Sequence, residues 1–405
     1  MTHLSEALPL EHGGALPNRI AKSAMSERLG TAEGAPSAEL VRLYERWGQG
    51  GSGLLITGNV MVDPSALGET GNVSVQDEAH LAALSAWASA AQVKGARVWM
   101  QINHPGRQSP RTLSKVPVAP SAIRLEGAGP AFARPRALLD EEVHAIVRRF
   151  AMTARIAERA GFDGVQIHGA HGYLISQFLS PRTNQRDDAW GGDAPRRRRF
   201  LLEIVRAIRA EVGRGFSLGL KLNSADFQRG GFSEEESMAL LEVLDGEAID
   251  LFEISGGTYE SAKMFEETLP THQSSQRREA FFLEYVERAR ARVRTPLLLT
   301  GGFRTLAGMQ EALETGAVDV IGMARPIALE PDLPNLLLGG IRDAALPVRL
   351  ATGSKKIDAV LQGAWYQRQI DRLGRGLEPD PRLSRLRVLG GYLLRRRVTA
   401  WTPEG

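Results

Sequence analysis

The sequence predicts an α/β protein, a (β/α)8 TIM barrel with an N-terminal turn and a C-terminal helical tail. Short apolar runs rich in Val, Ile and Leu alternate with longer amphipathic runs through most of the 405 residues. The short runs lack polar alternation, as do parallel strands that are buried on both faces. Eight strand–helix units follow one another, and a closed barrel is the economical way to arrange them.

Strands are expected where a short apolar run is bounded by turn residues. The expected strands are residues 19–24, 53–57, 97–102, the run through Val165 and Ile167, 217–222, 250–254, 296–300 and 319–323. The first follows a turn at Gly13 and Gly14. The fourth begins at Gly164 and breaks at once into a glycine-spaced turn.

Helices are expected between the strands, where apolar residues recur at helical spacing. The expected helices are residues 37–47, 77–94, 140–161, 197–212, one capped by Ser233, 278–293, 306–315 and 331–338, with 356–373 in the tail. Ser37 is a favourable N-cap for the first helix, and Gly48 begins the glycine-rich run that ends it. Gly95 ends the Ala-rich second helix, and Gly161 ends the third.

A doubly wound open sheet is the alternative fold. It would need a glycine-rich turn after the first strand to bind its usual dinucleotide, and Ala24-Met25-Ser26-Glu27 is no such turn. Residues 104–136 form a long, proline-rich, irregular insertion after the third strand. An insertion of this length is usually functional or covers a site.

The composition excludes several classes of chemistry. The chain has no cysteine, which removes disulfides, thiolate nucleophiles, zinc–thiolate sites and iron–sulfur clusters. A net charge of +3 is weak support for nucleic-acid binding. No basic segment followed by an apolar run opens the chain, and no apolar run reaches about 18 residues. A cytoplasmic protein with neither a membrane nor a nucleic-acid partner is therefore expected.

Two imidazoles and a phenol follow the fourth strand within six residues: His168, His171 and Tyr173. These side chains suit a site that hydrogen-bonds an oxygen and delivers a proton. A His-x-x-His zinc pair is the competing interpretation, but no third ligand is evident nearby. Considered without the barrel around them, the two histidines could as well be ordinary core or surface residues with no role in a site.

Polar residues and glycines also gather at the carboxyl ends of the other expected strands, where barrel active sites lie. The candidates at these ends are Ser23, Ala24, Met25, Ser26, Asn59, Gln101, Lys221, Gly301, Gly302, Phe303, Ala324 and Arg325. Gly301 and Gly302 open a helix whose N-terminus favours an anion such as phosphate, and Arg325 adds a fixed cation. Asn59, Gln101 and Lys221 suit the amide-like edge of a flat heterocycle. The ends lack clustered carboxylates, so a hard divalent metal is poorly supported.

These residues resemble the Old Yellow Enzyme family of flavin-dependent ene-reductases, also called NADH:flavin oxidoreductases. The resemblance covers roughly residues 5 to 340 and is most specific from Gly161 to Gly192. The motifs that carry it are Pro17-Asn18-Arg19-Ile20, Ala24-Met25, Gln101-Ile102-Asn103-His104-Pro105-Gly106-Arg107, Val118-Ala119-Pro120-Ser121, Gly161-Phe162-Asp163-Gly164, His168-Gly169-Ala170-His171-Gly172-Tyr173-Leu174, Gln177-Phe178-Leu179-Ser180-Pro181, Asn184, Arg186, Gly191-Gly192, Gly301-Gly302-Phe303-Arg304 and Ala324-Arg325-Pro326. Lys221 stands where Arg is common in the family, and Gln166 replaces a frequent Glu.

The resemblance implies an FMN cofactor bound without a covalent link at the barrel mouth, reduced by NADH or NADPH. It implies that residues 23–26 run along the isoalloxazine with Ser26 near N5 and O4, and that Asn59 and Gln101 contact the ring system. Lys221 would lie near N1 and O2. The phosphate would be held by Gly302, Phe303, Ala324 and Arg325, with Gly301 in the same turn.

The same resemblance implies reduction of the C=C bond of an α,β-unsaturated carbonyl compound. His168 and His171 would bind the carbonyl oxygen, and Tyr173 would protonate the α-carbon. Residues 1–345 would form the FMN-binding catalytic barrel, with a helical, basic tail at 346–405. The partners expected are a small enone-type substrate and, as one option, a second copy of the chain in a homodimer.

Two other classes of protein fit the barrel pattern. A metal-dependent barrel hydrolase would be colourless and would carry zinc. A non-catalytic barrel that only binds a ligand would carry neither flavin nor metal. The substrate pocket is expected to be shaped by the insertion at 104–136 and by residues 258–276.

Overall fold

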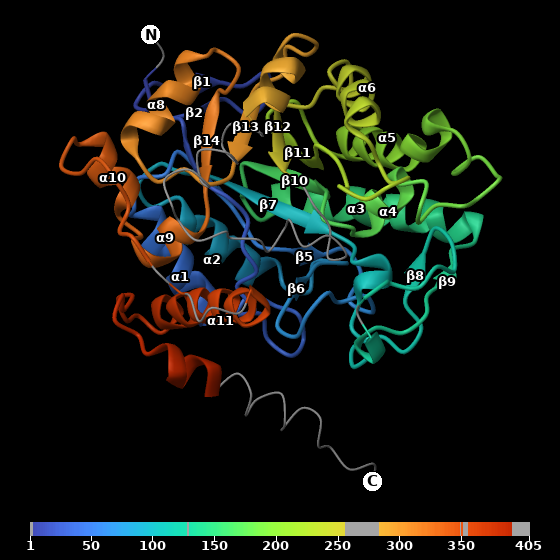
Figure 1. Cartoon of the computed structure of the whole chain (residues 1–405), viewed down its shortest axis with the longest axis horizontal. Helices are drawn as coiled ribbons and strands as arrows, with labels where there is room; N and C mark the ends of the chain where they lie inside the picture. The colour runs from blue at the N-terminus through green and yellow to red at the C-terminus, as the bar shows by residue number, and fades with distance from the viewer. Residues whose placement is uncertain (1–2, 128, 256–282, 349, 351–354, 391–405) are drawn as a thin grey trace.

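The computed structural model describes residues 3–127, 129–255, 283–348, 350 and 355–390. Its centre is a closed parallel barrel (Figure 1). The barrel strands are β3 (Ile20–Lys22), β4 (Leu54–Ile56), β7 (Arg97–Asn103), β10 (Gly164–Gly169), β11 (Ser217–Asn223), β12 (Leu251–Ser255), β13 (Leu297–Thr300) and β14 (Val320–Met323). They pair in chain order, and the pairing of β10 with β7 closes the ring. The predicted (β/α)8 barrel is confirmed.

The inner face of the barrel has two regions. Nearer the amino ends of the strands, inward side chains form one apolar cluster that includes Trp99, Leu251 and Val320. The antiparallel hairpin of β1 (Leu8–Pro9) and β2 (Ala15–Leu16) adds Leu8 and Leu16 to that cluster. The predicted N-terminal turn is therefore a hairpin that packs on the barrel interior, and the polar residues lie toward the carboxyl ends.

The helices α1 (Ala38–Gly48), α2 (Leu81–Ala91), α3 (Asp140–Arg159), α5 (Ala194–Glu211), α6 (Glu234–Leu244) and α8 (Leu306–Glu314) surround the barrel (Figure 1). Two of the sequence-predicted caps are present. Ser37 accepts a hydrogen bond from Leu40 N at 3.2 Å, and Ser233 accepts one from Glu236 N at 3.3 Å. Each cap satisfies a backbone donor that the first helical turn leaves free.

Some expected boundaries were wrong. The second helix begins at Leu81 instead of 77, because the Asp77 carboxylate accepts from Ala79 N in a separate turn. The helix expected at 331–338 is present as α10 (Leu333–Leu338), and a short helix that was not expected, α9 (Arg325–Leu329), precedes it. Of the helix expected at 278–293, residues 283–290 are helical, and 278–282 lie outside the described residues. Two short strands, β5 (Val60–Met61) and β6 (Val73–Ser74), extend the sheet beside β7.

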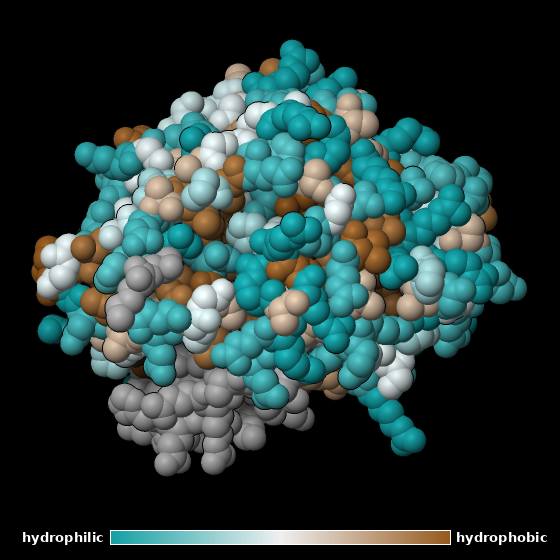
Figure 2. Space-filling model, turned by 90° about the horizontal axis from the view of Figure 1, so that it is seen from above, coloured by the Kyte–Doolittle hydropathy of each residue, from teal (hydrophilic) through white to brown (hydrophobic). Residues whose placement is uncertain are grey.

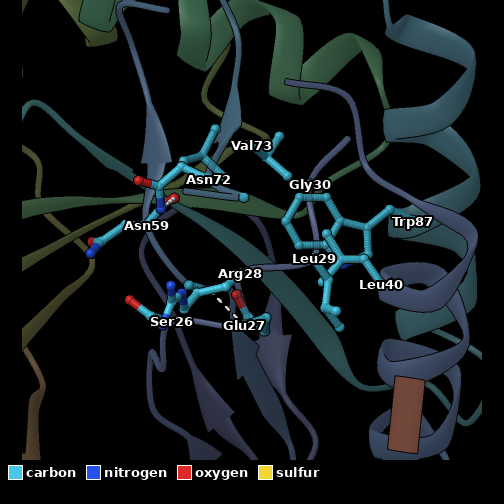
Figure 3. Close-up of a pocket in the computed structure, with 13 residues that line it drawn as sticks. Ser26, Glu27, Arg28, Leu29, Gly30, Leu40, Asn59, Asn72, Val73 and Trp87 are labelled. Carbon is cyan, nitrogen blue, oxygen red and sulfur yellow. Dashed lines mark hydrogen bonds between the residues drawn. The ribbon is translucent and has the colours of Figure 1, made fainter. Parts of the chain in front are cut away.

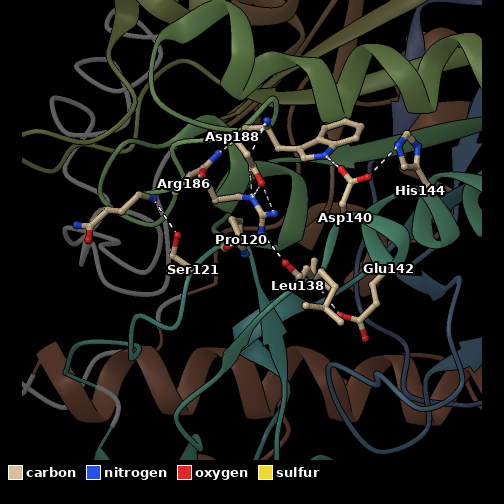
Figure 4. Close-up of polar contacts among 12 residues, drawn as sticks. Pro120, Ser121, Leu138, Asp140, Glu142, His144, Arg186 and Asp188 are labelled. Carbon is tan, nitrogen blue, oxygen red and sulfur yellow. Dashed lines mark hydrogen bonds and ion pairs between the residues drawn. The ribbon is translucent and has the colours of Figure 1, made fainter.

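Residues 104–136 form the expected insertion, and a clamp centred on Arg186 holds it (Figure 4). Arg186 Nη1 donates to the carbonyl oxygens of Pro120 at 3.1 Å and Leu138 at 2.6 Å, while Asp188 pairs with the same guanidinium. The insertion also contains the short parallel pair β8 (Val118–Ala119) and β9 (Arg136–Ala137). Arg186, one of the residues that carried the resemblance, therefore has a structural role in this fold.

The tail contains α11 (Lys355–Gly374), which lies beside α1 and α9 (Figure 1). Leu361, Trp365 and Ile370 of α11 are buried in the same apolar cluster as the helices around the barrel. The helix expected at 356–373 is thus present and packs on the barrel. The basic segment 395–397 lies outside the described residues.

The face of the molecule in Figure 2 is mostly hydrophilic, with apolar residues in small separate patches. Among the described helices, none combines the length and the apolar character needed to cross a membrane. The homodimer stays a prediction.

Candidate active site

His168, His171 and Tyr173 lie together at the carboxyl end of β10. His168 is in the strand itself rather than in the turn after it, and Tyr173 directly precedes the short helix α4 (Leu174–Leu179), which was not predicted. The His168 ring centroid is 5.1 Å from that of His171 and 4.9 Å from that of Tyr173, both in edge-on contact. The three side chains can therefore act on one bound molecule.

His168 is neutral. Its side chain is 3% exposed, and burial holds its pKa well below the usual range, with electrostatic repulsion from the neighbouring His171 and Lys221 side chains adding to the effect. The backbone N–H of Ala170 donates to His168 Nδ1 at 3.3 Å. Nδ1 is therefore the acceptor, and the ring proton resides on Nε2, which is available as a donor.

His171 is held in an unusual backbone conformation. Its φ of +60° is in the left-handed region, which non-glycine residues occupy only where other contacts hold them there. Asn223 Oδ1 accepts from His171 N at 3.3 Å, and Ser255 Oγ lies 2.8 Å from His171 Nε2. Burial, with Lys221 nearby, lowers the pKa of His171 to about 3, so this ring is also neutral at pH 7.

Tyr173 and Asn59 are neighbours. Tyr173 is 6% exposed, and Asn59 Nδ2 donates to its hydroxyl oxygen across 3.5 Å. Asn59 follows β4 and reaches this side chain from the other side of β7. The fold therefore brings together Asn59, expected to contact the ring system, and Tyr173, the expected proton donor.

A chain of hydrogen bonds crosses the barrel below these side chains. Gln101 Nε2 donates to Gln166 Oε1 at 2.7 Å, and Gln166 Nε2 donates to Glu253 Oε2 at 2.8 Å. Lys221 Nζ lies 2.9 Å from Glu253 Oε1. All four residues are buried. Gln101 and Lys221, predicted separately from two strand ends, are thus joined through two residues that were not predicted site members.

Ser26 and Asn59 line one small pocket (Figure 3). Its other end is apolar and includes Leu40 and Trp87. His168, His171 and Tyr173 do not line it, although Asn59, which does, contacts Tyr173. Within residues 23–26 the side chains diverge: Ala24 packs against the inner barrel cluster, and Met25 against the outer one.

The ends of β13 and β14 are adjacent, with Thr300 paired to Gly322. Gly302 follows β13 with φ +79°, which a side chain would make costly, and Phe303 is buried behind it. Ala324 precedes α9, and Arg325 is its first residue. The predicted phosphate residues therefore come from two neighbouring strand ends. Arg325 Nη1 donates to Gln362 Oε1 of α11 at 2.9 Å.

Sequence reasoning missed the network that anchors residues 23–26. Lys22 Nζ donates to Tyr44 OH at 2.9 Å and to the Ile56 carbonyl at 2.7 Å, and it pairs with Glu27 at 3.3 Å. Glu27 also accepts from Gly58 N at 2.9 Å. Burial lowers the pKa of Lys22 to about 8, although Glu27 opposes the shift. The available signal was a lysine inside an apolar strand followed five residues later by a glutamate.

No group of three or more His, Asp or Glu side chains in the described part of the chain could hold a metal ion.

Known proteins are similar to this chain in sequence and in fold. The family model described as NADH:flavin oxidoreductase / NADH oxidase matches residues 9–343. The NADH-dependent flavin oxidoreductase nadA of Aspergillus parasiticus is 40% identical over 348 residues, covering 82% of this chain and 78% of that protein. Morphinone reductase in complex with tetrahydroNAD superposes with a TM-score of 0.70 at 26% identity, covering 85% of this chain and 93% of the other.

A complex of 2-naphthoyl-CoA reductase gives a TM-score of 0.78 at 26% identity, and the match spans 84% of this chain and 52% of that one. The fold and the site thus define a barrel oxidoreductase that works with a flavin. The chain belongs to the NADH:flavin oxidoreductase family, which includes Old Yellow Enzyme. FMN is its cofactor, and a reduced nicotinamide is its electron donor.

The barrel mouth has unfilled hydrogen-bonding capacity that fits such a cofactor. Among the described residues, Asn59 Oδ1 and both amide atoms of Asn103 are buried without a partner. By strand alternation Asn103 lies on the same face of β7 as Gln101. Buried polar atoms left unbonded are costly, and the polar edge of a flavin would supply the missing donors and acceptors.

Proposed function

We propose that this enzyme reduces the C=C bond of α,β-unsaturated carbonyl compounds at the expense of NADH or NADPH. The observation that carries the proposal is the convergence of two neutral imidazoles and a buried phenol at one strand end. FMN supplies the hydride chemistry when bound. The side chains supply binding, charge stabilisation and a proton.

His168 and His171 bind the substrate carbonyl oxygen in this proposal. Negative charge develops on that oxygen as the β-carbon accepts hydride, and donors already in place lower the barrier without reorganising. His168 Nε2–H is a donor of the required kind, since its Nδ1 already accepts from Ala170 N. Ser255 lies 2.8 Å from His171 Nε2 and either orients that ring or gives way to the substrate.

Tyr173 is the proposed general acid for the α-carbon. Its ring lies edge-on to His168, and its hydroxyl oxygen is next to Asn59. A phenol positioned beside the oxygen-binding pair can protonate the neighbouring carbon of the same substrate.

The proposed cofactor contacts follow the strand ends. Ring contacts are assigned to residues 23–26, Asn59, Gln101 and Lys221, and phosphate contacts to residues 301–303, Ala324 and Arg325. Residues 1–345 form the catalytic barrel in this proposal, and the tail contributes through α11. The Lys22–Glu27 network supports the assignment of residues 23–26, because it fixes the backbone at both ends of that segment.

The visible spectrum of the purified protein tests the proposal. We expect flavin absorption that NADH or NADPH bleaches under anaerobic conditions and that a cyclic enone then restores, with the saturated ketone as product. A flavin that is reduced by the nicotinamide but not reoxidised by any enone would contradict ene-reduction while leaving the family assignment intact.

Removal of the Gln362 side chain is expected to weaken FMN binding. Gln362 holds Arg325 at 2.9 Å, and a hydrogen bond to a charged group contributes roughly 1 kcal/mol or more. Gln362→Ala should therefore raise the Kd for FMN about three- to tenfold, measured by flavin fluorescence quenching on the reconstituted protein. Arg368→Ala, on the same helix in a local pair with Asp371, is the matched control and should bind FMN as the parent does. Equal Kd values for all three proteins would show that the bond between Gln362 and Arg325 does not support FMN binding.

A further inference from the structure

Glu253 is a carboxylate buried inside the barrel, on β12, and it is 0% exposed. Its inward neighbour on the same strand, Leu251, belongs to the apolar inner cluster. A buried carboxylate is several kcal/mol unfavourable unless charged or polar partners surround it. Packing alone therefore does not explain why a carboxylate occupies position 253.

Three donors surround the Glu253 carboxylate. Lys221 Nζ lies 2.9 Å from Oε1, Thr300 Oγ1 donates to Oε1 at 2.8 Å, and Gln166 Nε2 donates to Oε2 at 2.8 Å. Lys221 is itself 5% exposed, so water screens this ion pair little. The two charges form a buried, nearly neutral unit.

The same carboxylate connects residues from three sides of the barrel mouth. Gln166 links it to Gln101 at 2.7 Å, and Thr300 links it to Ser23 at 2.7 Å. Gln101, Ser23 and Lys221 are all among the proposed ring contacts. Glu253 reaches Gln101 through Gln166 and Ser23 through Thr300, and it pairs directly with Lys221.

We infer that Glu253 is a positioning residue that sets the reduction potential of the flavin through Lys221. This inference rests on the proposed placement of Lys221 against the ring. Reduction adds negative charge to the cofactor, which a nearby cation stabilises and a nearby anion opposes. The paired carboxylate cancels much of the lysine's field, so the reduced cofactor stays a stronger hydride donor than an unpaired Lys221 would allow.

A charge cycle on the FMN-loaded protein tests the inference, with the midpoint potential measured by dye-coupled redox titration. Glu253→Gln keeps the side-chain shape and an acceptor oxygen but removes the charge, and it should raise the potential by about 30 mV or more, a tenfold change for a two-electron couple. Lys221→Gln should lower the potential. The double variant removes both charges and should return close to the parent.

Thr300→Val is the matched control. It removes one hydrogen bond to Glu253 Oε1 while keeping both charges, so the potential should move much less than in Glu253→Gln. If Glu253→Gln does not fold, the double variant still tests the inference, because removing a whole buried pair is often neutral or stabilising. In that case the midpoint potential of Lys221→Gln should be lower than that of both the double variant and the parent.

Opposite shifts that cancel in the double variant support the inference, since a purely structural role would not give shifts of opposite sign. An unchanged potential in Glu253→Gln, or shifts of the same sign in both single variants, overturns it. These outcomes are independent of enone turnover. Loss of the proposed function would show as a parent enzyme whose reduced flavin no enone reoxidises, whatever the order of the potentials.

Discussion

Tyr173→Phe is expected to lose enone reduction by two to four orders of magnitude, the range that a positioned general acid contributes. The phenol is buried, contacts the His168 ring and has its oxygen beside Asn59. Phenylalanine keeps the ring and its packing but has no proton to give. Flavin reduction by NADH should stay within about threefold of the parent, because that half-reaction needs no carbon protonation. Stopped-flow measurement of the two half-reactions separates the effects.

The control for this prediction is Tyr285→Phe, which removes another buried phenol hydroxyl, one bonded to Ser237 at 2.6 Å and separated from His171 by Ser237 and Asn223. It should leave reoxidation by the enone unchanged. An acceptor that takes electrons without carbon protonation, such as ferricyanide, should reoxidise the Tyr173→Phe enzyme at the parent rate. Enone reoxidation at the parent rate in Tyr173→Phe would exclude this residue as the acid.

Acidification from pH 6.5 to 4.5 is expected to lower the free energy of unfolding steeply. Burial lowers the pKa of His104 to about 4 and that of His168 well below its usual range. In the unfolded chain both imidazoles take up protons near pH 6.5. The unfolded state therefore binds more protons throughout this window, and stability falls as the pH falls. The loss by pH 4.5 is on the order of 2 kcal/mol for His104, and His168 adds a loss of the same sign.

His104→Asn isolates one of these contributions. The asparagine oxygen can replace His104 Nδ1 as the acceptor for Gly106 N, which donates at 3.1 Å, but the side chain does not titrate. Urea denaturation of the FMN-loaded protein at several pH values should show a shallower fall in stability for this variant. His3→Asn, at an exposed position, is the control and should follow the parent. Identical slopes for all three proteins would mean that His104 becomes protonated in the folded state as readily as in the unfolded one.

The barrel could be predicted from sequence because eight apolar runs of similar length leave few ways to bury parallel strands. Boundaries were less predictable where local hydrogen bonds compete, as at Asp77, whose carboxylate forms a turn before α2 begins. Helix α4 was not predicted because it has only six residues, all buried, and shows no polar face to give a helical period.

Within the candidate site, the closeness of His168, His171 and Tyr173 could be predicted from their glycine-spaced turn. The contacts that support these side chains could not. Glu253 lies far from Gln166 and Lys221 in sequence, and only the barrel register brings the three together. A charged residue in an apolar strand was nevertheless a readable signal. Gln362 had no signal of this kind, since its partner Arg325 is contacted only because α11 docks beside α9.

Arg186 holds the insertion through backbone carbonyl groups and not through side chains of the insertion. Arg186 binds the carbonyl oxygens of residues 120 and 138, which every amino acid presents in the same way. The stretch between these two anchor points can therefore change its sequence without losing these two main-chain contacts. Such an arrangement lets selection, or a protein engineer, exchange the loop to alter which molecules enter, while the barrel and its chemistry stay as they are.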